Sequence, residues 1–356
     1  MTHTRPSKLP MYTLFVYSLL LTYQTCADPV SYPFEQEKTQ SLTFESYQLS
    51  DKERQRISKH VHTQLRQRQS PSNSSSAQEA PSSIQLGMNG IPVFTQGQHG
   101  ACVTFALAAA IDAALGQGQY TSPLCLLQLG QHLERMNGEP SGWNGANDLQ
   151  IFLKRINNYG IISIENQQKY GCGGVHAYPE KEETPTSEMT LKNYLQHSDM
   201  IFKNKITWSV LWSNSLWSEL FASNDPVQLT QQALSTGHRV VIATMLPRIY
   251  AGKIPVGAIG TYQVSEDTWV LTPEIQQTID MQTRIPGHAM IVTGYDNHVC
   301  ATDRSNWQHC GLFTLRSSWG PNVGNGGDFY MSYDYFNTLA VEGIQIGLAN
   351  TIQEEH

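Results

Sequence analysis

The stretch Gln96-Gly-Gln-His-Gly-Ala-Cys102-Val-Thr-Phe105 places a cysteine at the start of a predicted helix. Small and apolar residues recur at helical spacing from Ala101 to Leu115, and Gly116 ends the run. The first turn of a helix has unpaired N–H groups and a partial positive charge, which favour a nucleophilic thiolate. Gln96 is positioned to direct its amide, with the N–H of Cys102, at the oxygen of a tetrahedral intermediate. A buried structural cysteine is the alternative interpretation.

A thiolate nucleophile needs a proton carrier, and His288 has a suitable setting. It follows Pro286-Gly287 and begins a strand-like run to Tyr295, so its imidazole is expected to face a cleft. The other histidines considered are expected at the surface, namely His176, His197 and His238. No set of His, Cys or acidic residues has the spacing of a four-ligand metal site, so neither a metal nor another cofactor is expected.

The order of the predicted elements indicates an α+β protein. Helical patterns come first, over residues 101–115, 124–135 and 147–158. After a further helix at 225–237, runs rich in β-branched and aromatic residues follow at 240–245, 288–295, 311–316 and 329–332. Helices followed by antiparallel strands predict two halves that enclose a cleft.

The composition restricts the class of protein further. The chain has 356 residues, 40% apolar and 15% charged, so it can bury a full core. Its formal net charge is −7, which does not favour nucleic acid as a partner.

The first residues have the pattern of an export signal. Arg5 and Lys8 precede an apolar run from Met11 to Tyr23, and small residues follow it. We expect a signal peptide over residues 1–27, and a secreted or periplasmic protein that does not contact the membrane after signal removal. An uncleaved anchor would need a longer apolar run, and the residues before Cys26 do not suit a lipoprotein signal.

Residues 28–83 have the layout of a propeptide. Ser50-Asp-Lys-Glu53 has the form of a capping box and begins a helical pattern that extends to about Gln69. The Ser/Pro-rich stretch from Ser70 to Ser83 is typical of a flexible, protease-accessible linker. A helix tethered ahead of a folded domain suggests an inhibitory segment that lies over the active site. An inert solubilising tail is the alternative.

Three motifs resemble, in order, those of the papain-like cysteine peptidases. The first runs from Gln96 to Phe105, the second is Gly287-His-Ala-Met-Ile-Val-Thr-Gly-Tyr295, and the third is Ser317-Ser-Trp-Gly320 with a glycine-rich turn after it. The resemblance covers about Gly87 to Leu348, and the short leader indicates a divergent bacterial member.

The resemblance implies a papain-like fold over residues 84–356, with a helical lobe, a lobe of antiparallel strands and the active site between them. Its implied activity is hydrolysis of peptides or proteins through a thioacyl-enzyme on Cys102, with His288 as general base and acid. It implies that Gln96 lies in the oxyanion hole and that Trp319 shields the histidine. The protein's own propeptide would act as an inhibitor.

The same resemblance implies a substrate-binding segment in Gly142-Trp-Asn-Gly145-Ala146, where Gly145 and Ala146 would pair with an extended peptide. His99 and Trp143 occupy two positions that form a disulfide in many family members.

Five cysteines remain after signal removal, so one is left over if four of them pair. The family pattern favours Cys102 as the reactive one, with the pairs Cys125–Cys172 and Cys300–Cys310. Four cysteines nevertheless allow three connectivities.

Ser317 stands where the family has an asparagine that orients the histidine ring. A hydroxyl is shorter and less fixed than an amide, so we expect a reduced rate, with loss of activity as the alternative. Asn306 and Asn322 are nearby candidates for the missing amide. A catalytically impaired papain-fold binding or inhibitory protein, and a Cys-His acyltransferase or deamidase, are the alternative functions.

The chain also has an excess of residues over the family spacing at about 173–225. This insertion contains Trp208, Trp212 and Trp217, whose spacing suggests one face of a helix. We expect either an extra packing layer or a lid or exosite at one end of the cleft.

Overall fold

The computed structural model describes residues 32–34, 40–42, 46–67, 81–146, 148–201, 205–213, 225–247 and 260–349. The predicted signal peptide, most of the Ser/Pro-rich linker and Trp217 lie outside these residues. Among the described helices, none combines the length and the apolar character needed to cross a membrane.

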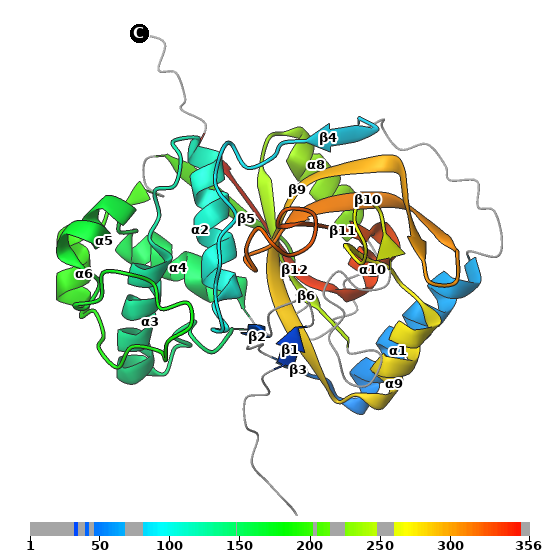
Figure 1. The fold of residues 1–356 in the computed structure, drawn as a ribbon, viewed down its shortest axis with the longest axis horizontal. Coiled ribbons are helices and arrows are strands. Elements are labelled where there is room, and N and C mark those ends of the chain that lie inside the picture. The colour runs from blue at the N-terminus through cyan, green and yellow to red at the C-terminus, as the bar shows by residue number, and fades with distance from the viewer. Residues whose placement is uncertain are drawn as a thin grey trace, which may run out of the picture.

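The chain forms a lobe of helices and a lobe built on a sheet (Figure 1). The helical lobe contains α2 (Cys102–Leu115), α3 (Pro123–Asn137), α4 (Leu149–Tyr159), α5 (Ile164–Tyr170) and α6 (Leu191–His197). The sheet lobe carries the helices α8 (Pro226–Ser235), α9 (Pro273–Met281) and α10 (Tyr333–Leu339). The predicted α+β class, with helices before strands, is confirmed.

The sheet is organised around one long strand, β9 (Arg284–Asp303). Its neighbours are β6 (Arg239–Met245), β7 (Gly260–Thr261) and β10 (Gln308–Arg316), and pairing continues through β11 (Asp328–Ser332) and β8 (Thr268–Trp269). Because β10 pairs with both β9 and β11, the strands β7 to β11 close into a ring. Beyond β6 the sheet extends to β12 (Ala340–Leu348) and β5 (Ile206–Ser213).

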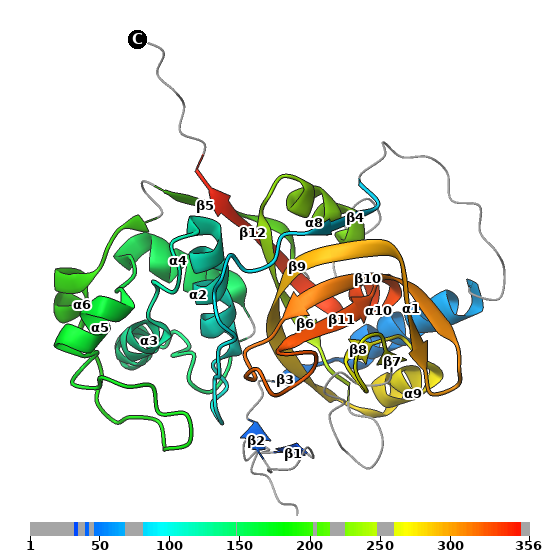
Figure 2. The same cartoon turned by 45° about the horizontal axis from the view of Figure 1, so that its top comes forward.

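Helix α2 lies at the boundary of the two lobes (Figure 2). It is built largely from alanine and leucine, which favour helix, and it ends at Gly116 in the left-handed conformation (φ 65°). Nearly all its side chains are buried, and it packs against β6, β9 and β12 as well as α3 and α4. Its small side chains let the strand that carries His288 approach the helix that carries Cys102.

The segment ahead of the helical lobe docks on the sheet lobe. After β1 (Tyr32–Phe34) and β2 (Gln40–Leu42), strand β3 (Ser46–Gln48) pairs with the first residues of β9, and β4 (Ser83–Gln85) pairs with residues 294–296 of the same strand. Strand β9 therefore holds the chain both before α1 and at the end of the linker.

The predicted capping box and helix are present. Helix α1 (Asp51–Gln67) follows Ser50, whose backbone N–H donates to Glu53 Oε2 at 2.7 Å, while Ser50 Oγ accepts from the Glu53 N–H at 3.3 Å. The helix buries Ile57 and Val61 and packs against α9 and α10.

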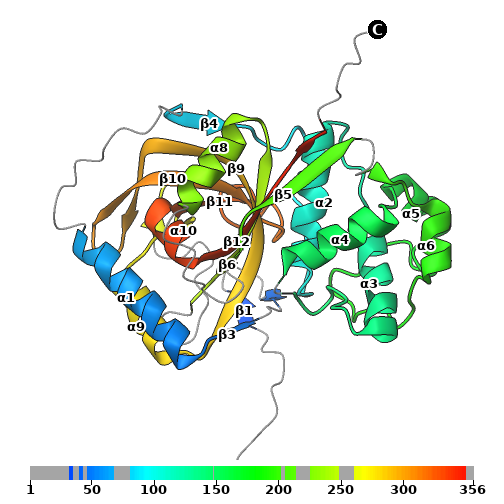
Figure 3. The same cartoon turned by 180° about the vertical axis from the view of Figure 1, so that it is seen from behind.

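The expected position of this helix over the active site is wrong. Seen from behind, α1 lies beside α9, on the side of the sheet lobe away from the helical lobe (Figure 3). The apolar side chains Ile57 and Val61 find their partners there, and a helix with one apolar face docks where that face is buried.

The tryptophans of the insertion also differ from expectation. Trp208 and Trp212 lie on strand β5, not on a helix. A spacing of four residues puts side chains on one face of a strand as well as on one face of a helix, so the spacing was ambiguous. Trp212 packs over Gly343 of β12, where a Cβ would lie 2.2 Å from the indole.

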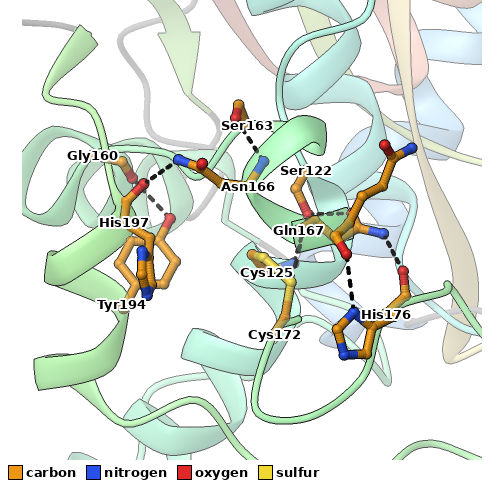
Figure 4. The surroundings of a disulfide bond; sticks show 11 residues. Ser122, Cys125, Gly160, Ser163, Asn166, Gln167, Cys172, His176, Tyr194 and His197 are labelled. Atoms are coloured by element: carbon orange, nitrogen blue, oxygen red, sulfur yellow. Dashed lines mark hydrogen bonds between the residues drawn. A yellow bond between two sulfur atoms is a disulfide. The ribbon is translucent and has the colours of Figure 1, made fainter. Parts of the chain in front are cut away.

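Two disulfides link neighbouring elements, in the pairing that the sequence favours. Cys125 of α3 bonds to Cys172, just after α5, and Cys300 of β9 bonds to Cys310 of β10. Figure 4 shows the first of these beside Ser122, which accepts from the Cys125 N–H at 3.0 Å and donates to Gln167 Oε1 at 2.7 Å. Cys102 takes part in neither disulfide.

Candidate active site

Cys102 is the first residue of α2, as predicted. Its side chain is 8% exposed, and the N-cap residue Ala101 has no side chain that could bond to the N–H groups of the first turn. This end of the helix therefore keeps its partial positive charge directed at the thiol and at any anion formed next to it.

His288 lies inside the sheet lobe near the start of β9, opposite Thr244 of β6. Its Nε2 is hydrogen-bonded to Ser317 Oγ at 3.1 Å. The indole of Trp319 stacks on the imidazole, with 4.1 Å between ring centroids and 16° between planes. One ring nitrogen and one ring face are thus fixed by the segment that follows β10.

Burial sets the protonation of this histidine. Because the ring is withdrawn from water, the pKa of His288 is lowered from 6.5 to about 3. The imidazole is therefore neutral at neutral pH unless an anion forms beside it, and a neutral imidazole is able to accept a proton.

Gln96 is buried and held on both sides of its amide. Its Nε2 donates to the His99 carbonyl at 2.7 Å, and its Oε1 accepts from Ser318 Oγ at 2.7 Å. Its backbone N–H donates to the Ser318 carbonyl at 2.8 Å. An amide nitrogen carries two hydrogens, so the His99 carbonyl uses one of them. The bonds between Gln96 and Ser318 thereby join two segments. One is the loop before Cys102, and the other is the segment that contains Ser317, the partner of His288.

The segment expected to bind substrate lies against the same loop. The Gly100 N–H donates to the Trp143 carbonyl at 2.9 Å, and a Cβ on Gly100 would lie 2.7 Å from Gly145 N. Gly145 has a φ of 103°, which a residue with a side chain rarely adopts. Ala146 is partly buried.

His99 and Trp143, which occupy the disulfide positions of the resembled family, are in contact. The rings of His99 and Trp143 meet edge to face, with centroids 4.9 Å apart. Sequence reasoning identified both residues but not the third ring of the group, Tyr178, which stacks on Trp143 at 5.7 Å. The sequence also gave no indication that Ser318 is a partner of Gln96, although Ser318 lies within the motif Ser317-Ser-Trp-Gly320.

Comparison with known proteins gives distant structural similarity only. No family model matches this chain, and no curated protein matches it. Among solved structures, xylellain, a cysteine protease from Xylella fastidiosa, is 19% identical, with a TM-score of 0.48, over 78% of this chain and 91% of its own.

Two further structures have similar scores. Digestive procathepsin L 3 from the larval midgut of Tenebrio molitor is 17% identical, with a TM-score of 0.41, over 86% of this chain and 83% of its own. The proform of the ragweed pollen allergen Amb a 11, a cysteine protease, is 13% identical, with a TM-score of 0.44, over 82% of this chain and 76% of its own. At such identities and scores, a function for this chain has to come from its own residues.

Proposed function

We propose that this protein is a cysteine peptidase that hydrolyses peptide bonds through a thioacyl-enzyme on Cys102. The observation that carries the proposal is the fixed imidazole of His288, held at Nε2 by Ser317 and covered by Trp319. With Nε2 engaged by the hydroxyl, Nδ1 is the nitrogen that exchanges a proton with the thiol and later with the leaving group.

Acylation follows from this assignment. Nδ1 of His288 takes the proton of Cys102 as its sulfur attacks the peptide carbonyl carbon, and the carbonyl oxygen becomes an anion. The Cys102 N–H and the second amide hydrogen of Gln96 are the donors that stabilise this oxygen. The imidazolium then gives its proton to the departing amine, and the C–N bond breaks.

Deacylation uses the same groups in the opposite direction. His288 removes a proton from water as the water attacks the thioester, and the tetrahedral intermediate forms again next to Gln96. Collapse of this intermediate breaks the C–S bond, and the proton returns to the sulfur. An extended peptide that pairs with Gly145 and Ala146 would lie along the loop that precedes Cys102.

Reactivity of the thiol provides the direct test. After incubation of the reduced protein with an epoxysuccinyl peptide, mass spectrometry is expected to find one adduct, located on Cys102, because only an activated thiolate opens the epoxide quickly. The Cys102→Ala variant should gain no mass. An unmodified wild-type protein whose N-terminal region has been removed would contradict the proposal.

Ser317 gives a second prediction. Ser317→Ala removes the hydroxyl partner of Nε2, so the imidazole is oriented less firmly, and kcat is expected to fall about tenfold with little change in KM. Ser305→Ala, at an exposed serine, is the matched control. Equal kcat values for Ser317→Ala and the wild type would exclude an orienting role for the hydroxyl.

The same residue supports the alternative function. A hydroxyl holds an imidazole less firmly than the amide of the resembled family, and this difference is the one observation in favour of a catalytically impaired binding or inhibitory protein. The presence of Cys102, His288 and Gln96 together favours the peptidase. Absence of an adduct on Cys102 would favour this alternative. An adduct combined with transfer of acyl groups, or release of ammonia from glutamine, would instead favour the acyltransferase or deamidase.

Export and self-inhibition belong to the proposal. The two disulfides support an oxidising compartment, secreted or periplasmic. If residues 28–83 act as an inhibitory propeptide, cutting the linker is not enough to release them. Strand β3 and helix α1 must also separate from β9, α9 and α10.

A further inference from the structure

The loop of residues 178–184 lies against the loop that holds Gln96 and leads into Cys102. Tyr178 Oη donates to the Gln96 carbonyl at 2.8 Å. The Gln98 N–H donates to the Glu180 carbonyl at 3.0 Å, and Gln98 Nε2 donates to the carbonyls of Lys181 and Glu182. Four hydrogen bonds thus join two segments about eighty residues apart in the sequence.

The fit between the two loops is close. A Cβ on Gly97 would lie 1.9 Å from the Glu180 carbonyl oxygen, so only glycine allows this approach, and its φ of 60° is also a glycine conformation. His99 Nε2 donates to the Pro179 carbonyl at 2.6 Å, and Nδ1 lies 3.4 Å from Thr184 Oγ1. A carbonyl only accepts, so the neutral ring carries its proton on Nε2.

Tyr178 is the centre of an aromatic group. Its ring stacks on Trp143 with 6° between planes and meets Phe105 of α2 and His99 edge to face, at 4.9 and 5.8 Å. Rings packed in these two arrangements are stabilised beyond the burial of their surface. Many members of the resembled family have a disulfide between the positions that correspond to 99 and 143. This chain has a group of four rings there instead, formed by Phe105, His99, Trp143 and Tyr178.

We propose that Tyr178 is a positioning residue of the oxyanion hole, acting through the Gln96 carbonyl, and that the aromatic group replaces the missing cross-link. The inference rests on the peptidase function proposed above and adds a regulatory consequence to it. The contact between positions 99 and 143 is made by aromatic rings and not by a disulfide. A reductant that activates Cys102 therefore leaves this contact intact.

The Tyr178 hydroxyl acts on the side-chain amide of Gln96 through the backbone of that residue. The backbone of Gln96 is held at its N–H by Ser318 and at its carbonyl by Tyr178. Without the second bond the backbone of Gln96 is held at its N–H only, so the Cα that carries the side-chain amide is fixed less precisely. Burial raises the pKa of Tyr178 above its ordinary value, so the hydroxyl remains a donor at every pH relevant to a peptidase.

Tyr178→Phe keeps the ring and removes only the hydroxyl. We expect kcat for a peptide substrate to fall about fivefold, with KM within twofold of wild type. A peptide aldehyde adds to the thiol with the thiol proton passing to the aldehyde oxygen, and its inhibition constant should rise by a similar factor because that oxygen occupies the oxyanion hole. Alkylation of Cys102 by iodoacetamide, which needs a thiolate but no oxyanion donor, should proceed at the wild-type rate.

Tyr170→Phe is the matched control, because Tyr170 is an exposed tyrosine of the same lobe that stacks on His197. Unchanged kcat and aldehyde inhibition in Tyr178→Phe would overturn the inference. So would a parallel fall of kcat, alkylation rate and melting temperature, which would indicate a general structural role. Failure of the proposed function is distinguishable from both, because the wild-type protein itself would then show neither hydrolysis nor rapid alkylation.

Discussion

Cys102→Ser is expected to lower kcat/KM for a peptide substrate by at least about 10⁴-fold. A serine hydroxyl is a far weaker acid than a thiol, so its proton passes to His288 much less readily as the oxygen attacks the peptide carbonyl. Serine is slightly smaller than cysteine and is well tolerated at a helix start, so the fold should be retained. Release of labelled peptides from casein measures the loss of kcat/KM, and an unchanged melting temperature shows that the fold is retained.

The outcome separates the catalytic thiol from a structural one. A buried cysteine that only fills space would give a Ser variant with altered stability and unaltered turnover. Activity above about 1% of wild type in a carefully purified Cys102→Ser variant would place the nucleophile elsewhere. Among the described residues the four other cysteines are joined in disulfides, so they offer no alternative thiol in the oxidised protein.

Local sequence signals were sufficient for the elements that carry Cys102 and His288. The alanine-rich run after Cys102 has a helical period and a glycine stop, and the run after His288 is rich in β-branched residues, so each element has one favourable conformation. The resemblance to a known family then indicated that the two residues face each other. A local sequence pattern carries no information on this relative placement.

Longer-range features could not be predicted in the same way. Nothing in the capping box of α1 specifies that the helix docks on α9 rather than over the site, because docking depends on a distant apolar surface. The spacing of Trp208 and Trp212 is shared by helix and strand. Tyr178 lies in an insertion without periodicity, and its role depends on a hydrogen bond to a residue 82 positions earlier.

The second large effect is expected at His288. His288→Gln keeps a polar group beside Ser317 but removes the proton acceptor, so kcat/KM near pH 7 should fall at least about 10³-fold. The rate at which iodoacetamide alkylates Cys102 should fall at pH 6–7, because no imidazole then accepts the thiol proton as the sulfur attacks, and it should recover only as the pH rises toward the ordinary thiol pKa of about 8.5. His298→Ala, at an exposed histidine of the same strand β9, should follow the wild-type profile.

Stability should change with pH in the opposite sense to a histidine that gains a charged partner. The pKa of His288 is about 3 in the folded protein and 6.5 in the unfolded chain, so between these values the unfolded chain binds a proton that the folded protein does not. The contribution of this group to the free energy of unfolding is therefore complete above about pH 6.5 and is lost as the pH falls toward 3. Glutamine does not titrate, so urea unfolding of His288→Gln should lack this part of the acid destabilisation. Equal pH slopes for the variant and the wild type would mean that His288 is protonated in the folded protein, as it would be if a resting thiolate–imidazolium pair formed with Cys102.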